Sequence, residues 1–468
     1  MKSLVSPAPL LIACILAVFG LSQSSNALLW MACLFALPVI VWLAGGKKTP
    51  SVLLWIVAIS WSQVVGDVLY ADLVGDSIVN NPAGSARELA IVFSLSALCA
   101  LALGMRNGNL FGKWVFRTTG EAPAAEELPL DLNRLVACYI CLLVIMQVLG
   151  VLEQAEPAFL QPVVVIGSLK YVLVYLVAIT VLENEQKYFW LIFILALEVM
   201  TGVMSFFSYY KESIFIVLIA IASSRRPIRA RNIVIAAAAL VAVFWLSLVW
   251  TTIKREYRTV MFDMSVSQRV DYMADKYFTA NIDYRDSFRR LVSRIGYTTL
   301  YSKVIEKEQV GSLPDGFDYY KGAVWHVLTP RILFPDKPAL DDSKGTVALL
   351  GMRIAEGTSI GVGYIAQAHV DFGFPGLLLP IFVIGFLLGV CWQYFTTRPV
   401  YHLVGEAFGV AVLFESFLFA ANIDKSLGAF FTMWLGLGLI LRFGYPAIRY
   451  FLAIPSVRPS FSAPRSAI

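Results

Sequence analysis

Long apolar runs are the feature that most constrains this chain. A helix needs about 20 apolar residues to cross the roughly 30 Å hydrocarbon core of a bilayer, where every backbone polar group must be satisfied internally. The mean hydropathy is +0.72, and only 15% of the 468 residues are charged. About twelve runs are predicted to cross as helices: 8–24, 27–45, 52–70, 88–105, 134–152, 158–183, 188–206, 210–223, 232–252, 373–395, 407–421 and 428–446. The sequence therefore predicts an all-α polytopic membrane protein.

The first run and the cysteines support no special processing or metal chemistry. The run 8–24 lacks a strongly basic segment before it and a small-residue cleavage site after it, so we interpret it as a retained helix, with a removed signal peptide as the alternative. All six cysteines lie inside apolar runs and are expected to pack as small core residues. Cys138 and Cys141 form a CxxC pair, but no second pair at ligand spacing accompanies them. No metal, no cofactor and no nucleic-acid partner is predicted.

Loop cations give the chain one consistent orientation. Lys and Arg concentrate in short cytoplasmic loops. In this chain the cations of alternate loops fall on one face, from Lys47 and Lys48 after the second run to Arg449, Arg458 and Arg465 in the tail. Both termini are therefore predicted to be cytoplasmic.

The predicted domain organisation follows from this orientation. Nine helices in residues 1–252 and three in residues 373–446 flank one hydrophilic segment, residues 253–372. That segment is too long for an unstructured connection in a compact protein, so we expect a folded, helical external (periplasmic) loop domain. Residues 447–468 are predicted to form a cytoplasmic tail.

The spacing of apolar residues predicts helices in the external segment. Two amphipathic helices are expected over 265–277 and 284–307, and two shorter helices over 319–328 and near 343–355.

Cations gather on the predicted outer side. The stretch TPRILFPDKPALDD, residues 329–342, sets Arg331 and Lys337 among prolines that forbid a continuing helix and stiffen the backbone. Arg290 and Arg294 lie on a predicted amphipathic helix, and Lys211 lies at the outer mouth of the eighth run. Arg can donate two parallel hydrogen bonds to phosphate oxygens, and Lys supplies a compact positive charge. These cations therefore indicate a phosphate-bearing ligand near the lipid headgroups. The alternative is that each cation pairs with a nearby acid and contributes little.

Ionisable residues inside the apolar runs form a second group. An unpaired charge at the bilayer centre costs at least about 2.5–3.5 kcal/mol on insertion scales. Lys170 and Glu198 lie near the middle of adjacent antiparallel runs, and we expect a structural ion pair between them, far from the outer surface. Asp67 and Glu415 lie in the outer halves of their runs and are predicted to face a cavity roofed by the external domain.

Four stretches resemble a known family. They are SYYKES at 208–213, FRRLVSRIGY at 288–297, PRILFPDKP at 330–338 and GVGYIAQAHVDFGFPG at 361–376. They are similar to segments of the Wzy-type O-antigen and exopolysaccharide polymerases, which are related to the O-antigen ligases. The resemblance covers about residues 200–380 well and the first 200 residues only in hydropathy. Its most specific part is PRILFPDKP followed by DFGFPG.

The resemblance implies a metal-independent glycosyl transfer at the outer face of a bacterial cytoplasmic (inner) membrane, with the active site facing the periplasm. A glycan would move from an undecaprenyl diphosphate carrier onto a hydroxyl of a lipid-linked repeat unit. The expected partners are these lipid-linked oligosaccharides, membrane lipid, a chain-length regulator and a flippase. Fixed cations would stabilise the departing diphosphate. The residues expected in this role are Lys211, Arg290, Arg294, Arg331 and Lys337.

The acceptor hydroxyl requires a base, and the same segment supplies the candidates. His369 is the first choice, followed by Glu356 and Asp371; the alternative for His369 is a side chain that satisfies hydrogen bonds at the membrane surface. Family members often carry an acid in the glycine-rich segment, where this chain has Gln367. An O-antigen ligase would use the same site. A transporter of lipid-linked oligosaccharide is a further alternative, although the chain shows no matched halves.

Overall fold

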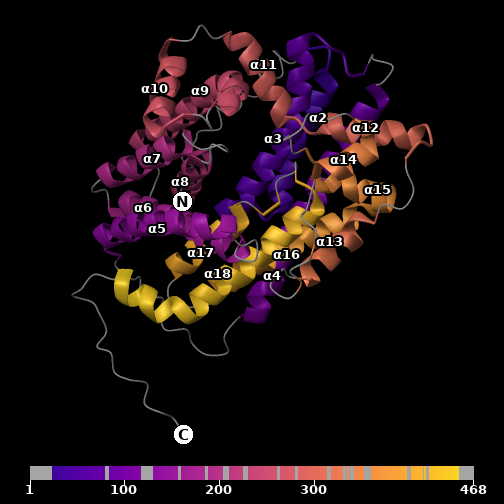
Figure 1. Cartoon of the computed structure of the whole chain (residues 1–468). Helices are drawn as coiled ribbons and strands as arrows, with labels where there is room; N and C mark the ends of the chain where they lie inside the picture. The colour runs from indigo at the N-terminus through magenta and orange to yellow at the C-terminus, as the bar shows by residue number, and fades with distance from the viewer. Residues whose placement is uncertain are drawn as a thin grey trace.

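A computed structural model describes most of the chain (Figure 1). The described residues are 24–79, 84–116, 130–155, 160–184, 188–203, 210–224, 230–260, 264–279, 283–313, 318–329, 334, 337, 342–352, 360–397, 402–414, 416–417 and 421–452. They form helices joined by turns and contain no β-strand. The prediction of an all-helical fold is confirmed for this part of the chain.

In chain order, the described helices are α2 (Ala27–Leu43), η1 (Gly46–Lys48), α3 (Ser51–Val74), α4 (Gly84–Phe116), α5 (Leu132–Ala155), α6 (Leu160–Asn184), α7 (Tyr188–Val203), α8 (Tyr210–Ser223), α9 (Ala230–Val260), α10 (Val266–Thr279), α11 (Tyr284–Ile295), α12 (Thr298–Gln309), α13 (Tyr319–Leu328), α14 (Asp342–Leu350), α15 (Tyr364–Gly376), α16 (Leu378–Thr396), α17 (His402–Phe414) and α18 (Ile423–Leu452). In Figure 1, α10 to α15 lie along the top and right of the molecule, and α5, α6, α17 and α18 lie toward the lower left.

Within the described residues, six helices are long and apolar enough to cross a membrane. They are α3, α4, α5, α6, α16 and α18. Shorter apolar helices lie within α2, α7, α9 and α17. Every predicted apolar run from 27–45 onward overlaps a helix in its described residues, whereas the run 8–24 lies outside the described residues. The helical nature of these runs is confirmed, and the count of twelve spans stays a prediction.

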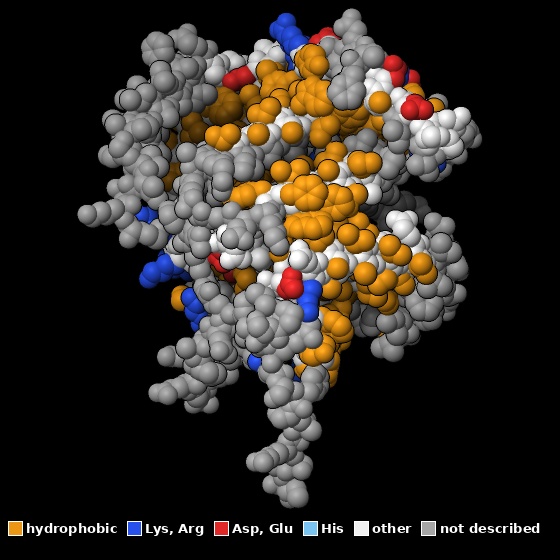
Figure 2. Space-filling model, turned by 90° about the vertical axis from the view of Figure 1, so that its left-hand side faces the viewer, with side chains coloured by type: hydrophobic (Ala, Val, Ile, Leu, Met, Phe, Trp, Pro, Cys, Tyr) orange, Lys and Arg blue, Asp and Glu red, His pale blue; other side chains and the backbone are white. Residues whose placement is uncertain are grey.

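Apolar side chains cover much of the surface. Figure 2 shows hydrophobic side chains spread over the middle of one face, with few charged side chains among them. On α18, Leu435, Leu439 and Phe443 are 65%, 55% and 73% exposed. Residues four apart lie on one face of a helix, so these three form an outward stripe. An exposed stripe of this kind is suited to contact with lipid.

Helices α4 and α16 pack at backbone contact. Gly104 and Gly108 on α4 face Gly385 and Gly389 on α16, with the same four-residue spacing in each helix. A Cβ at Gly108 would overlap the backbone of Phe386, and a Cβ at any of the other three would overlap the facing backbone as well. Lipid tails are as apolar as the helices, so association of membrane helices depends on such close packing of small residues. This contact holds the N-terminal helices against the C-terminal ones.

The predicted helices at 265–277 and 319–328 match α10 and α13, and the one near 343–355 overlaps α14. The prediction of one continuous helix over 284–307 is wrong, because α11 ends at Ile295 and α12 begins at Thr298. The break has a tertiary cause. A Cβ at Gly296 would overlap the carboxylate of Asp67 on α3, so a glycine is needed where the chain passes that acid.

Both predicted boundaries of the external segment fall inside helices. Helix α9 continues past residue 252 to Val260, where buried Tyr257 packs with Met273 of α10 in a small core separate from the main one. At the other end, α15 runs from Tyr364 to Gly376 and is kinked at Gly373, whose φ is 62°. Helices α9 and α15 thus cross the predicted boundaries of the segment 253–372.

Candidate functional site

Helix α11 is fixed against two helices by polar contacts. The guanidinium of Arg289 donates to the carbonyl oxygen of Leu73, in the last turn of α3, at 3.0 Å. The hydroxyls of Ser287 and Thr252, the latter on α9, lie 2.6 Å apart. Because Arg294 follows in the last turn of the same helix, these contacts also set its position.

Lys211 and Arg294 lie within electrostatic range of each other. Lys211 lies in the first turn of α8, where the positive charge of Arg294 and the negative charge of Glu212 act on it in opposite senses. Partial desolvation and then the charge of Arg290 lower the pKa of Arg294 below its usual value. Neither Lys211 nor Arg294 forms an ion pair or a hydrogen bond with another described residue. Like charges held together disfavour their own charged state, and a bound anion would relieve that cost.

Arg290 lies one turn before Arg294 and already has a partner. Its guanidinium lies 2.5 Å from the carboxylate of Asp286, and both side chains are about half exposed to solvent, at 60% and 48%. An exposed ion pair of this kind contributes roughly 0–1 kcal/mol to stability. The pair can therefore open at little cost if a stronger anion binds beside it.

Lys337 is placed elsewhere, at the end of α13. Its ammonium donates to the carbonyl oxygens of His326, at 2.5 Å, and Thr329, at 2.9 Å. These carbonyls belong to the last turn of α13 and the residue after it, so Lys337 caps that helix. The other predicted residues, Arg331, Glu356 and Glu415, lie outside the described part of the chain.

His369 is buried in an interface between α15, α12 and α4. Its Nε2 lies 2.7 Å from the carboxylate of Glu308, and its ring stacks on Phe93 and meets the edge of Tyr301. Only 3% of the residue is exposed, and Nδ1 has no hydrogen-bond partner among the described residues. The side chain therefore joins helices in this structure and does not open onto the Lys211–Arg294 pair.

Asp371 caps the N-terminus of α13. Its two carboxylate oxygens accept from the backbone N–H groups of Tyr319, at 3.2 Å, and Tyr320, at 2.7 Å. Burial raises the pKa of the Asp371 carboxyl above its usual value, and these two donors act in the opposite direction. An acid at this position satisfies N–H groups that would otherwise lack partners.

Helix α12 separates these base candidates from the cation pair. Thr298, at its start, follows closely after Arg294 in the chain, and Glu308, near its end, is the partner of His369. Ten residues at about 1.5 Å each correspond to about 15 Å along a helix axis. A hydroxyl reacting beside Lys211 and Arg294 would therefore lie far from His369.

Asp67 occupies the N-terminus of α12. Its carboxylate accepts from the hydroxyls of Thr298, at 2.5 Å, and Thr299, at 2.8 Å, and from the N–H of Thr299 at 3.1 Å. The residue is 3% exposed. The start of α12, which belongs to the segment 253–372, covers this acid and fills the space beside it.

Replacing Asp67 by alanine is expected to lower stability. The change leaves the buried hydroxyl of Thr298 without its partner, at about 1–3 kcal/mol for a buried unsatisfied group, and it also removes the acceptor of the exposed residue Thr299. The midpoint of thermal unfolding of the purified protein should fall, and limited proteolysis should cut near residue 296 earlier. Asp271→Ala, at an exposed position on α10, is the matched control. A midpoint equal to that of the control would show that Asp67 does not hold α12.

The predicted ion pair between Lys170 and Glu198 is confirmed. The ammonium lies 3.1 Å from the carboxylate, which also accepts from the hydroxyls of Tyr139, at 2.6 Å, and Ser213, at 2.7 Å. The pair lies near the start of α8, because Ser213 is two residues from Lys211, and the expectation that the pair lies far from the outer surface stays a prediction. Helices α7 and α8 are short, so a residue near the middle of an apolar run lies within two turns of a helix end.

Glu212 is a residue that sequence reasoning missed. It lies in the first turn of α8, its charge acts on neighbouring Lys211, and its carboxylate accepts from the hydroxyl of Tyr171 on α6. The signal was present in SYYKES, where the acid follows the cation directly.

Among the described residues, no group of three or more His, Cys, Asp or Glu side chains could hold a metal ion.

The fold defines a helical protein whose longest apolar helices are suited to a membrane. Within that class, the chain belongs to the family described as a domain of unknown function, DUF8712, whose model matches residues 119–423. The matched region contains Lys211, Glu212 and Arg294, and it excludes α2 to α4 with Asp67. Neither the curated proteins nor the solved structures include a match to this chain.

Proposed function

We propose that this protein is a membrane glycosyltransferase that polymerises lipid-linked oligosaccharide repeat units. It transfers a glycan from undecaprenyl diphosphate onto a hydroxyl of another lipid-linked unit. The observation that carries the proposal is the pair Lys211 and Arg294, two cations that act on each other and have no ion-pair partner among the described residues. A diphosphate is the kind of ligand that such a pair stabilises.

The proposed reaction uses the cations at the leaving group. The bond between the anomeric carbon and the diphosphate oxygen breaks, and its electron pair stays on the diphosphate. The acceptor oxygen forms the new glycosidic bond and loses its proton. Charge on the diphosphate grows as the bond breaks, so fixed cations stabilise the transition state more than the bound substrate. Arg290 can add a third contact if its exposed pair with Asp286 opens.

We assign the proton transfer to Glu212 in preference to His369 or Asp371. The acceptor hydroxyl attacks the carbon next to the diphosphate, so its base must lie beside the cations. Glu212 neighbours Lys211 and is held by the hydroxyl of Tyr171. His369 and Asp371 have roles in the packing of α12 and α13 instead.

The membrane arrangement is part of the proposal. Twelve spans, cytoplasmic termini and an external loop domain at 253–372 would put Lys211 and Arg294 at the outer face of a bacterial inner membrane. This arrangement is supported by the loop cations of the sequence and by the apolar helices. A flippase would deliver the lipid-linked units to that face, and a chain-length regulator would act on the product.

Cells that lack the protein are expected to accumulate single repeat units on the lipid carrier and to make no long polymer. The lipid-linked fraction can be extracted and its glycan length measured by mass spectrometry. Re-expression of the wild-type chain should restore the polymer. Polymer of normal length on the carrier, with none on a final acceptor, would instead identify a ligase that uses the same site. Normal polymer in both pools would contradict the proposed function.

A further inference from the structure

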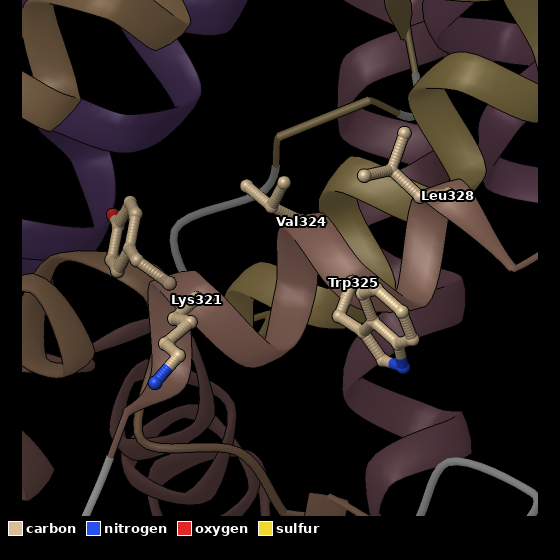
Figure 3. A pocket seen from close by; sticks show the side chains of 5 residues that line it. Lys321, Val324, Trp325 and Leu328 are labelled. Atoms are coloured by element: carbon tan, nitrogen blue, oxygen red, sulfur yellow. The ribbon is translucent and has the colours of Figure 1, made fainter.

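Helix α13 presents an apolar face to the outside of the molecule. Val324, Trp325 and Leu328 are 51%, 68% and 66% exposed. Figure 3 shows them with Lys321 in two rows along the helix, Val324 and Leu328 in one and Lys321 and Trp325 in the other. Together with Tyr320 they line an open, almost entirely apolar groove. In water such a face would be costly to leave uncovered.

The opposite face of α13 is firmly attached. Asp371 caps its N-terminus, the hydroxyl of Tyr320 donates to the carbonyl of Tyr364 at 3.0 Å, and Ala323 is fully buried. Lys337 caps its C-terminal end. With contacts at both ends and along one side, α13 cannot turn its apolar face inward without losing them.

The position of α13 on α18 indicates what covers the outer face. A Cβ at Gly428 of α18 would lie 3.5 Å from the ring of His326, so α13 passes over that point of α18. Leu435 is seven residues further along, which is close to two full turns, and therefore lies on the same face of α18. Leu435 begins the outward apolar stripe of this helix. The exposed face of α13 thus continues a stripe on a helix that is long and apolar enough to cross a membrane.

We propose that α13 lies in the membrane surface, with Val324, Trp325 and Leu328 in contact with the acyl chains of one leaflet. A helix with one apolar and one polar face suits this position, and Trp favours the boundary between lipid and water. Lys321, which pairs with Asp318 and is 82% exposed, can extend its charged end to the headgroups. Part of the segment expected to face water is therefore a lipid-contacting element.

This inference does not depend on the reaction, and its test needs no substrate. A nitroxide label is attached at a cysteine in place of Trp325, and in a second variant in place of Val324, in lipid nanodiscs of phosphatidylethanolamine and phosphatidylglycerol. Collisions of the label with oxygen, which concentrates in lipid, and with a water-soluble nickel chelate are measured by electron paramagnetic resonance. Unmutated protein treated in the same way gives the background from native cysteines.

The expected result is frequent collision with oxygen and rare collision with nickel at both positions. Leu435→Cys is the lipid-facing control, and Val310→Cys, at an exposed position beside the charged end of α12, is the water-facing control. Nickel accessibility like that of position 310 would place α13 in water and overturn the proposal. Low accessibility to both reagents would mean that protein covers the face, as in contact with a second copy, and would overturn it equally.

Discussion

Replacing Gly108 by leucine is expected to abolish recovery of folded protein. A Cβ at this position overlaps the backbone of Phe386, so α4 and α16 must separate. Overpacking costs about 1–3 kcal/mol where side chains can adjust. Here the new side chain meets backbone atoms of α16, which cannot adjust as a side chain can. The two helices would therefore also separate at Gly104, Gly385 and Gly389, which belong to the same contact. The yield of monodisperse protein after detergent extraction should fall far below that of the wild type.

The control for this change is Gly345→Leu. Gly345 also lies in a helix, α14, but a Cβ there would have no neighbour within 4 Å. The control should be extracted at close to wild-type yield. If Gly108→Leu behaved like Gly345→Leu in size-exclusion chromatography and thermal unfolding, α4 and α16 would not pack as described.

Removing the charge of Lys211 or Arg294 is expected to lower polymer synthesis by roughly 30- to 1000-fold. The estimate follows from about 2–4 kcal/mol for one lost contact to charge that develops in a transition state. Lys211→Met and Arg294→Met keep most of the side-chain volume. Because the two cations act unfavourably on each other, either change should leave thermal stability unchanged or raise it. Lower activity without lower stability is the signature of a binding role.

Three further variants serve as a control and as comparisons for this experiment. Lys48→Met, a cation in the short helix η1, is the control and should keep wild-type activity. Arg290→Met should have a smaller effect than Arg294→Met, because Arg290 is already paired with Asp286. Glu212→Gln should lower the rate while substrate binding is retained, as expected for a base. If Lys211→Met and Arg294→Met both kept more than about half of wild-type activity, well short of the expected loss, these cations would not bind the diphosphate.

Helix positions could be predicted because they depend on local pattern. The run 319–328 matches α13, and 265–277 lies within a residue or two of α10, since apolar spacing and turn residues decide where such helices begin and end. The break between α11 and α12 could not be predicted. It depends on the contact between Gly296 and Asp67, which are more than 200 residues apart, and residues 284–307 alone show an uninterrupted helical pattern.

The sequence likewise predicts some features of the candidate site and not others. The cations of SYYKES and FRRLVSRIGY are visible in the sequence, and their convergence on one ligand stays a prediction. The partners of the acids and of His369 are not visible. Asp371 meets the start of α13, and His369 meets Glu308, through contacts across 51 to 61 positions. A titratable residue in a glycine-rich segment looks the same in sequence whether it caps a helix or meets a substrate.

The most direct test of the account is polymer synthesis by the purified protein. Lipid-linked repeat units extracted from cells that lack the protein are incubated with wild-type chain in nanodiscs, and glycan length and released undecaprenyl diphosphate are measured together. The expected result is a ladder of longer glycans with one released carrier for each bond formed, and loss of both products with Lys211→Met and Arg294→Met. Folded wild-type protein that leaves the single units unchanged, or variants that make the same ladder, would contradict it.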